Sequence, residues 1–436
     1  MKNKIILSRR DFIKGSAAIA GTVSIGTLPF SLKAKNTNES VIKIALIGCG
    51  GRGTGAAAQA LSVKQNVKLV AMADAFQDRL DSSFANLIQD SVLKSKVDVR
   101  ENKKFVGLDA YKKAIDECDV AILTTPPGFR PLHLDYAISK NKHVFTEKPL
   151  ATDAVGIRKV LDLVSLSKSK NLNVVVGLQR HYQLLYRELI KRIQDGMIGD
   201  ITSGQVYWDG SGVWVKDREA GMTELVYQMR NWYYFNWLCG DHIVEQHIHN
   251  IDVFNWVKGS YPVKAQGLGG RQVRTGKQYG EIFDHHYVEY TYADGSILNN
   301  QCRHIPGCME RVSESFVGTK GRADSSGTIY DLQGKILWKH RDEDDPNPYQ
   351  VEHDELFASI ENGKVINDLE YGAKSTMTAI MGRMATYSGL ELTWEEALNS
   401  NIKLVPEELS WDSRPPLTPD ADGFYPIAVP GVTKVL

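Results

Sequence analysis

Residues 240–252, GDHIVEQHIHNID, place three histidines and three acidic side chains within one short segment. On a helix, Glu245, His249 and Asp252 would be four and three positions apart and would share one face. A histidine is suited to accept a hydroxyl proton near neutral pH, and a flanking carboxylate orients its ring and stabilises its cation. One interpretation of this spacing is a catalytic pair, with His249 as the base and Glu245 as its partner.

Two other interpretations fit the same segment. His242, Glu245 and His249 could converge on a metal ion, whereas His247 would lie on another side of a regular helix and could not chelate the ion together with His249. A solvated helix without a chemical role would have the same spacing. The segment alone leaves these alternatives open, so the elements around it must decide between them.

A nucleotide-binding turn stands near the start of the folded chain. The segment VIKIALIGCGGRGTGAAAQAL reads as a buried strand, a glycine-rich turn and an alanine-rich helix. Gly48 would make the tight turn, Gly50 would let a pyrophosphate approach the backbone, and Gly53 would allow the helix to pack closely on the strand. The next strand, VKLVAMAD, ends in Asp74, where an acid accepts the ribose hydroxyls and repels a 2′-phosphate. We therefore expect NAD as the cofactor.

The following runs, CDVAILTTPP and KHVFTEKPL, alternate with helix-like segments and predict a doubly wound parallel sheet. Ligands of such sheets bind beyond the carboxyl ends of the strands. Lys148 would stand near the nicotinamide, unless it is a structural lysine paired with Glu147. Because the nicotinamide already supplies the electrophile, we expect no metal. The expected cofactor-binding residues are Gly48, Gly50, Gly51, Arg52, Gly53, Asp74, Thr125, Pro126, His133, Glu147 and Lys148.

Four motifs, GCGGRG, TTPPGFRPLH, VFTEKP and VGLQRHY, together resemble the Gfo/Idh/MocA oxidoreductases, which include glucose-fructose oxidoreductase and inositol dehydrogenase. The resemblance extends over the chain from residue 41 onward. It implies an N-terminal Rossmann domain and a C-terminal α/β domain with an open sheet that holds the substrate. It also implies that the lysine of the E-K-P motif, Lys148, is catalytic.

The same resemblance bears on the histidine segment. The family carries a D-x-x-x-H element with another Asp three residues beyond the His, which here falls on His249 and Asp252. This sequence departs from the pattern, because Glu245 replaces the usual Asp and His247 stands where many relatives have glycine. With the resemblance counted, we take Lys148, His249 and Glu245 as the catalytic residues.

The residue pattern of the chain changes after residue 180. The aromatic runs SGQVYWDGSGVW and DHHYVEYTYADGSILNNQCRH predict a mostly antiparallel sheet, and the second run is a hairpin that turns at residues 293–295. A long helix should end at Gly389, and a short helix should follow from Thr393. We expect an NAD-binding Rossmann domain at 41–180, a substrate-binding α/β domain at 181–405 and an extended tail at 406–436. The expected substrate-binding residues are Arg180, Tyr182, Arg230, Asn231, Trp232 and Asp252.

Residues 1–34 predict a twin-arginine signal peptide, since Arg9 and Arg10 precede a small-residue apolar run and a polar spacer. The run is too short for a comfortable membrane span, and no cysteine follows it for a lipid anchor. Cys302 and Cys308 could pair in an oxidising compartment. Lys plus Arg equals Asp plus Glu, at 52 each, so nothing argues for nucleic acid or an acidic membrane surface. We expect a periplasmic protein without a membrane anchor, and the resemblance implies a homo-oligomer, a dimer or tetramer.

The twin-arginine route carries folded proteins, so a cofactor can be loaded before export and retained. We therefore expect an exported carbohydrate oxidoreductase with tightly bound NAD(H), which oxidises or reduces a ring hydroxyl, at position 3, of a sugar or glycoside. Oxidation there acidifies the neighbouring C–H bond, which gives one alternative, an NAD-dependent glycosidase that works by transient oxidation and elimination. A non-catalytic sugar-binding protein is the other alternative.

Overall fold

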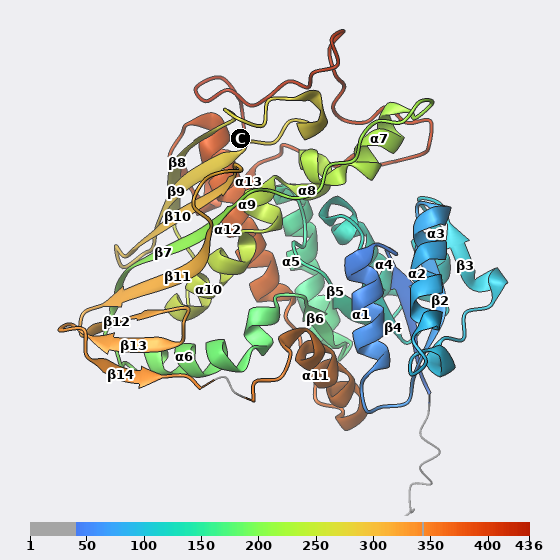
Figure 1. Cartoon of the computed structure of the whole chain (residues 1–436), viewed down its shortest axis with the longest axis horizontal. Coiled ribbons are helices and arrows are strands. Elements are labelled where there is room, and N and C mark those ends of the chain that lie inside the picture. Colours follow the sequence, from blue (N-terminus) through green and yellow to red (C-terminus); the bar gives the residue numbers. More distant parts are fainter. Residues whose placement is uncertain (1–40, 342–343) are drawn as a thin grey trace, which may run out of the picture. The chain divides into compact units, whose positions relative to one another are not determined.

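The structure, a computed structural model, describes residues 41–341 and 344–436. The signal peptide predicted at residues 1–34 lies outside the described residues. The described ranges contain a pair of sheets, and Figure 1 shows the first in blue to green and the second in green to orange. Residues Val41–Leu436 form one compact unit.

The first sheet has six parallel strands in the order β3-β2-β1-β4-β5-β6. They are β1 (Ile42–Ile47), β2 (Val67–Asp74), β3 (Lys104–Val106), β4 (Val120–Leu123), β5 (His143–Thr146) and β6 (Val174–Val176). Their connecting helices are α1 (Gly51–Leu61), α2 (Gln77–Gln89), α3 (Ala110–Asp116), α4 (Arg130–Ser139) and α5 (Ala154–Ser169). The order reverses between β1 and β4, which is where such sheets bind dinucleotides. The predicted doubly wound sheet is confirmed.

Both faces of this sheet are covered, as a parallel sheet requires. Successive side chains of β1 point to opposite faces: Ile44 and Leu46 pack with α1 and α2, while Ala45 and Ile47 pack on the side of α3 and α4. Every residue of β4 and of β6 is buried. This explains why these strands read as continuous apolar runs without alternation.

The second sheet has nine strands in the order β14-β13-β12-β11-β7-β10-β9-β8-β15. They are β7 (Ile201–Gly210), β8 (Lys264–Gly270), β9 (His285–Thr291), β10 (Ile297–His304), β11 (Arg311–Gly318), β12 (Gly321–Asp324), β13 (Thr328–Asp331), β14 (Ile336–Lys339) and β15 (Leu392–Thr393). Among the described strands of this sheet only β7 and β10 pair in parallel. The predicted mostly antiparallel sheet and the β9–β10 hairpin, with Gly295 at φ 82° in its turn, are confirmed.

The remaining helices join the two halves. They are α6 (Leu184–Gln194), α7 (Glu224–Arg230), α8 (Asn236–Cys239), α9 (His242–Glu245), α10 (Ile248–Lys258), α11 (Pro348–Asn362), α12 (Leu369–Ser388) and α13 (Trp394–Asn399). The long helix α12 ends at Gly389 (φ 74°) as predicted, and a capping box at Thr393 begins α13. Helix α12 packs on both α5 and β8. Helix α11 packs on α1 and β6, so a segment far beyond residue 180 covers the first sheet (Figure 1).

The histidine segment is not one helix. Helix α9 ends at Glu245, a turn follows at Gln246 and His247, and α10 begins at Ile248. The turn has a tertiary cause, because the Gln246 side-chain oxygen bonds His304 on β10 at 2.7 Å and His247 becomes fully buried. The prediction that a continuous helical face carries this segment is therefore wrong.

The structure also bears on the expected disulfide and on membrane spans. Cys302 is buried and Cys308 is exposed, and both are free thiols, so the disulfide considered for them does not form in the structure. Over residues 41–341 and 344–436, no helix combines the length and the apolar character that a membrane span demands.

Candidate active site

The glycine-rich turn joins β1 to α1 and is shaped by close backbone contacts. Gly48 has φ 97°, a conformation that side chains other than glycine rarely adopt. A Cβ on Gly53 would lie 2.0 Å from the carbonyl oxygen of Gly48, so the helix can pack here only with glycine. A Cβ on Gly50 would meet nothing within 4 Å, so space for a ligand lies beside this residue. The turn therefore has the form that a pyrophosphate requires at a helix N-terminus.

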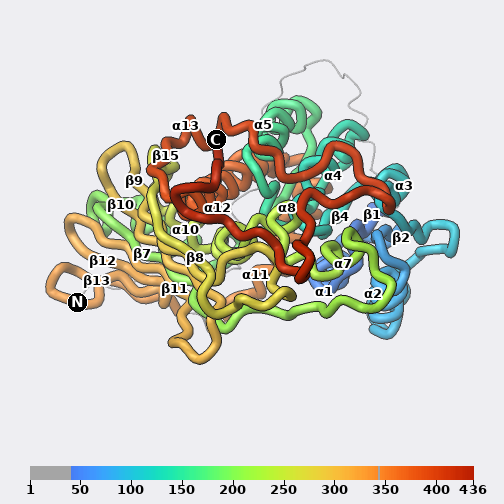
Figure 2. Tube along the Cα trace, turned by 90° about the horizontal axis from the view of Figure 1, so that it is seen from above, coloured from blue at the N-terminus to red at the C-terminus, as the bar shows by residue number. Residues whose placement is uncertain are grey.

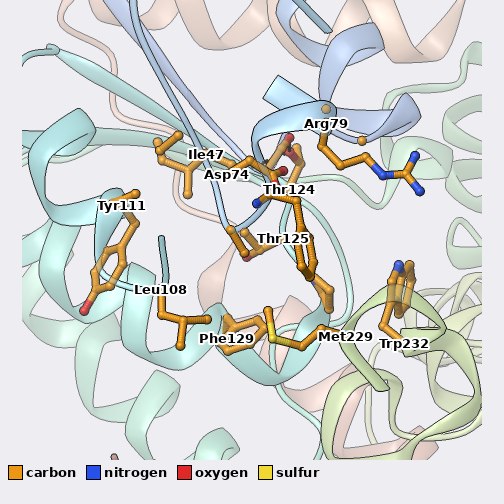
Figure 3. A pocket seen from close by; sticks show the side chains of 18 of the residues that line it. Ile47, Asp74, Arg79, Leu108, Tyr111, Thr124, Thr125, Phe129, Met229 and Trp232 are labelled. Atoms are coloured by element: carbon orange, nitrogen blue, oxygen red, sulfur yellow. Dashed lines mark hydrogen bonds between the residues drawn. The ribbon is translucent and has the colours of Figure 1, made fainter. Parts of the chain in front are cut away.

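A cavity of about 570 Å³ opens from this turn (Figure 3). Asp74 stands in its wall, and its carboxylate accepts the backbone N–H groups of Cys49 at 2.6 Å and Phe76 at 2.9 Å. Burial raises the pKa of Asp74, and these two hydrogen bonds oppose the rise. The predicted cofactor-binding residues that line the cavity are Gly48, Gly50, Gly51, Arg52, Gly53, Asp74, Thr125, Pro126 and His133; Glu147 and Lys148 are not part of its lining.

His133 fixes the wall of the cavity at the end of β4. Its Nδ1 lies 3.1 Å from the hydroxyl of Thr125, and its ring packs 4.2 Å from the ring of Tyr111. Burial lowers the pKa of His133 to about 3, so the ring is neutral at physiological pH. Arg130 was missed by the sequence reasoning: it is fully buried and donates to the carbonyl groups of Leu123 and Thr125, both at 2.7 Å. An arginine directly after the TTPPGF motif was the available signal.

Glu147 pairs with Arg52 and leaves Lys148 free for another partner. Arg52 Nε lies 2.5 Å from Glu147 Oε1, and a second guanidinium nitrogen lies 3.2 Å from Glu352 on α11. Burial and the nearby charge of Glu147 raise the pKa of Glu352. No local pattern could have found Glu352, because 300 positions separate it from Arg52. Lys148 is therefore not paired with Glu147, so the alternative of a structural lysine with that partner is wrong.

Lys148 instead joins the two halves of the molecule. Its Nζ donates to the backbone carbonyl of Glu245 at 2.6 Å and to the Glu245 carboxylate at 3.0 Å. Both side chains are nearly buried, with 12% and 13% of their surfaces exposed. This corrects the predicted role of Glu245, whose hydrogen bonds go to Lys148 and not to His249. The reason is the break after α9, which takes Glu245 and His249 onto separate helices.

His249 is buried on α10, and its ring stacks on the indole of Trp208 with centroids 6.0 Å apart. Burial lowers the pKa of His249 well below its usual value, and the positive charges of Lys148 and Arg180 lower it further. Among the described residues the ring Nδ1 has no hydrogen-bond partner. The ammonium of Lys148 and the imidazole of His249 are thus close enough to influence each other, and the ring is present as a free base.

Three predicted substrate residues have polar partners within the protein. The hydroxyl of Tyr182 donates to Asp368 at 2.7 Å. Asp252 accepts the hydroxyl of Ser375 at 2.7 Å and lies 2.8 Å from His181 Nε2. These bonds correct the predictions for Tyr182 and Asp252, because a buried polar group is normally satisfied within the fold. Arg180 forms an ion pair with the buried Glu314.

The other three predicted substrate residues lie on the cofactor side. Arg230 and Trp232 line the same cavity as the glycine turn, and Figure 3 shows Trp232 on the side of the cavity away from Tyr111. Asn231 is fully buried, accepts the N–H of Lys216 at 2.8 Å and donates to the carbonyl of Gln278 at 2.8 Å. Asn231 is therefore a structural residue, which corrects the prediction, and Arg230 and Trp232 face the nucleotide pocket.

Comparison with known proteins agrees with this geometry. Two models of the Gfo/Idh/MocA oxidoreductases match the chain: the NAD-binding Rossmann fold over residues 42–178 and the C-terminal alpha/beta domain over residues 190–400. An inositol 2-dehydrogenase of Rhizobium meliloti is 25% identical over 284 residues, which are 64% of this chain and 74% of the relative. A glycosyl hydrolase family 109 protein of Streptomyces coelicolor is 26% identical over 165 residues, 37% of this chain and 33% of the relative.

A solved structure shares the fold across nearly its whole length. The aldose-aldose oxidoreductase of Caulobacter crescentus, complexed with glycerol, superposes with a TM-score of 0.63 at 16% identity and covers 81% of this chain and 99% of its own. The two matching models together span both sheets, the glycine turn, Lys148 and His249. The chain therefore belongs to the Gfo/Idh/MocA family and is an NAD-dependent oxidoreductase.

Proposed function

We propose that the protein is an exported carbohydrate oxidoreductase that keeps NAD(H) bound and oxidises or reduces a ring hydroxyl, at position 3, of a sugar or glycoside. The observation that carries the proposal is the meeting of Lys148, from the end of β5, with α9 and α10 of the second half. Glu245 binds the lysine directly, and the charge of Lys148 contributes to the lowered pKa of His249. Such an ammonium and imidazole can act on one substrate hydroxyl.

The two side chains have complementary roles in this reaction. His249 is a free base at neutral pH, because burial and the charge of Lys148 disfavour its cation, so it can accept the hydroxyl proton. Lys148 donates two hydrogen bonds to Glu245, and an ammonium carries three N–H donors, so one donor remains for the substrate oxygen. NAD supplies the hydride acceptor when it is bound. Trp208 presents an indole beside His249 on which a sugar ring can stack.

The relatives support a polyol or sugar as the substrate. One is named an inositol 2-dehydrogenase, and the protein of similar fold is named an aldose-aldose oxidoreductase. A reaction between two sugars returns the hydride within one protein, which suits an enzyme that does not release its cofactor. We therefore infer that a second sugar re-oxidises the bound NADH in this protein.

Retention of the cofactor is supported by a segment that crosses the cavity. We define the strap as residues 213–232 together with the tail residues 404–425. The cavity that the glycine turn lines is also lined by five side chains of the strap, Trp214, Lys216, Met229, Arg230 and Trp232. Figures 1 and 2 show α7 and the dark red tail passing near the edge of the first sheet. A dinucleotide in this cavity would contact these side chains of the strap, which supports its retention.

Within the strap, the tail residues hold α7 in place. The hydroxyl of Tyr425 donates to Glu224 at 2.5 Å, and Gln228 donates to the carbonyl of Leu417 at 2.7 Å. Trp411 lies 5.6 Å from the ring of Phe76, which follows the ribose-binding position of β2. Because the tail joins α7 to the first sheet, strap opening requires several contacts to break together.

Export to the periplasm stays part of the proposal, and its support is the sequence of residues 1–34. Homo-oligomer formation is also proposed, since the open sheet leaves apolar side chains exposed, among them Leu268 at 75%, Val312 at 50% and Tyr287 at 41%. Fractionation of the cells that make the protein, and light scattering of the purified chain, test these two points separately.

Mass spectrometry of the purified chain with a panel of glycosides tests the reaction. We expect NAD(H) to copurify and a ketosugar to form by loss of two hydrogen atoms from the sugar. Lys148→Ala should abolish the product while NAD(H) stays bound. Lys142→Ala is the matched control, because Lys142 is another half-buried lysine of the β5 region and bonds a backbone carbonyl, that of Cys118, at 2.6 Å. A chain that carries NAD(H) and changes none of the glycosides would refute the proposal.

A second candidate is an NAD-dependent glycosidase that works by transient oxidation and elimination, and the family 109 relative favours it. Release of the aglycone without accumulation of a ketosugar would establish this outcome in the same assay. A non-catalytic sugar-binding protein would bind the glycoside with unchanged affinity in the Lys148→Ala variant and would form neither product.

A further inference from the structure

Three buried side chains converge at the start of α9, apart from the contacts of Lys148 and His249 in the candidate active site. Asp241 caps α9, His242 is its first residue, and His286 lies on β9. All three are at most 1% exposed, and one ligand atom from each lies within 4.8 Å of the others. Asp241 Oδ1 is 3.3 Å from His286 Nε2 and 3.8 Å from His242 Nε2.

The hydrogen bonds around His286 determine which ring nitrogen carries the proton. The hydroxyl of Thr386 donates to the carbonyl of Arg383 at 3.0 Å, so its oxygen can only accept from His286 Nδ1, which lies 2.9 Å away. In a neutral ring Nε2 then carries no proton, and its lone pair faces the Asp241 carboxylate. A lone pair and a carboxylate oxygen repel each other unless a cation lies between them.

His242 presents a second nitrogen of the same kind. Its Nε2 is buried and, among the described residues, has no hydrogen-bond partner, as is also true of His286 Nε2. His304 stacks on His242 with ring centroids 4.3 Å apart and fixes its orientation.

The carboxylate of Asp241 is the third group, and an unusual backbone conformation directs it at these two nitrogens. Asp241 has φ 72° and ψ 161°, a region that residues other than glycine rarely occupy. Its Oδ2 accepts the hydroxyl of Tyr387 at 2.5 Å and the N–H of Phe283 at 3.0 Å, while Oδ1 accepts the backbone N–H of His242 at 2.5 Å and lies beside both imidazoles. Oriented ligands with such outer hydrogen bonds are typical of protein metal sites.

We propose that Asp241, His242 and His286 bind a divalent first-row transition-metal ion, for which Zn²⁺ is the probe. Two imidazoles and one carboxylate are a donor set that such ions accept, and metal–ligand distances of about 2.0–2.2 Å at tetrahedral angles separate ligand atoms by about 3.3 Å. The observed 3.3 Å and 3.8 Å separations need little adjustment to reach this arrangement. The fourth position is left for a water molecule.

The ion would tie the start of α9 to β9 in the second sheet. The same short helix ends at Glu245, which binds Lys148, so the ion stabilises the helix that positions the lysine. The histidine segment thus binds metal through Asp241 and a distant strand, and not through the trio His242, Glu245 and His249 that its spacing suggested. The proposal stands on the three side chains and is independent of the substrate.

Elemental analysis of the full chain, purified from medium that contains zinc, tests the site. We expect about one divalent transition-metal ion per chain, and a tetrahedral visible absorption band after replacement by Co²⁺. His286→Gln should lower the metal content at least tenfold. His353→Gln is the matched control, because His353 on α11 is also fully buried with both ring nitrogens unpartnered in the described structure, and its metal content should equal that of the native chain.

Native protein that contains no transition metal and takes up neither Zn²⁺ nor Co²⁺ would overturn the proposal. Unchanged metal content in a folded His286→Gln variant would overturn it as well. If that variant does not fold, the metal content and the Co²⁺ spectrum of the native chain decide the question. Circular dichroism identifies which case applies, and none of these measurements uses the reaction.

Discussion

Arg230 is the residue through which the strap is joined most directly to the nucleotide pocket. Its two terminal nitrogens each lie 2.7 Å from an oxygen of Asp78 on α2, and its guanidinium lies 3.8 Å from the centre of the Phe76 ring. Asp78 is 60% exposed, so solvent screens the ion pair, which contributes about 0.2–1 kcal/mol. The contact with the ring adds about 0.5–1 kcal/mol. Arg230→Ala should therefore weaken strap closure by about 1–2 kcal/mol.

This loss corresponds to release of bound NAD(H) about 5 to 30 times faster than from the native chain. The assay mixes the protein that carries NADH with an excess of a non-fluorescent dinucleotide and follows the decay of bound-NADH fluorescence. Arg230→Lys should give an intermediate rate, since lysine keeps the charge but lacks the planar fork. Arg311→Ala is the control, because Arg311 covers the Tyr207 ring at the same 3.8 Å distance on β11 and does not line the cavity.

The reasoning would be refuted by a folded Arg230→Ala variant that releases NADH at the native rate. Equal acceleration by Arg311→Ala would also refute it, because the effect would then be one of general stability. Salt screens an ion pair but not the contact with a ring. If NADH release depends on salt in the native chain and not in Arg230→Ala, that dependence measures the ion-pair contribution separately.

Three further predictions concern other regions of the molecule. Gly50→Ala should lose NAD(H) and melt at the temperature of the native chain from which NAD(H) has been removed, whereas Gly53→Ala should lose NAD(H) and melt below that temperature, because only the second Cβ meets the backbone, at 2.0 Å; calorimetry and cofactor analysis check this. Lys148→Ala should raise the pKa of His249, since one of the charges that disfavour its cation is removed; an NMR titration that finds no rise would contradict this. Burial holds the pKa of His353 at about 3, so the unfolded chain binds more protons than the folded chain as the pH falls below about 6.5, and stability falls with it. His353→Gln should make the loss of unfolding free energy between pH 7 and pH 5 smaller by about 2 kcal/mol, measured by urea unfolding.

Much of the fold could be predicted because it follows from local patterns. Apolar runs without alternation indicated the strands of the first sheet, and alternating aromatic runs indicated the β9–β10 hairpin. Gly389 and Thr393 marked the end of α12 and the start of α13 through their capping chemistry. The glycine turn and Asp74 were identified because short-range spacing determines both their backbone shape and their place at the strand ends.

The partners of the polar side chains could not be predicted in the same way. The sequence by itself determined which residues can carry charge or protons, among them Lys148, Glu245 and His249. Only the tertiary structure decided that Glu245 binds Lys148, that Glu352 on α11 reaches Arg52, and that Asp241 and His242 meet a histidine of β9. The physical reason is that a buried polar group must find its partner wherever packing brings one, and helical spacing holds no information about a strand that lies far along the chain.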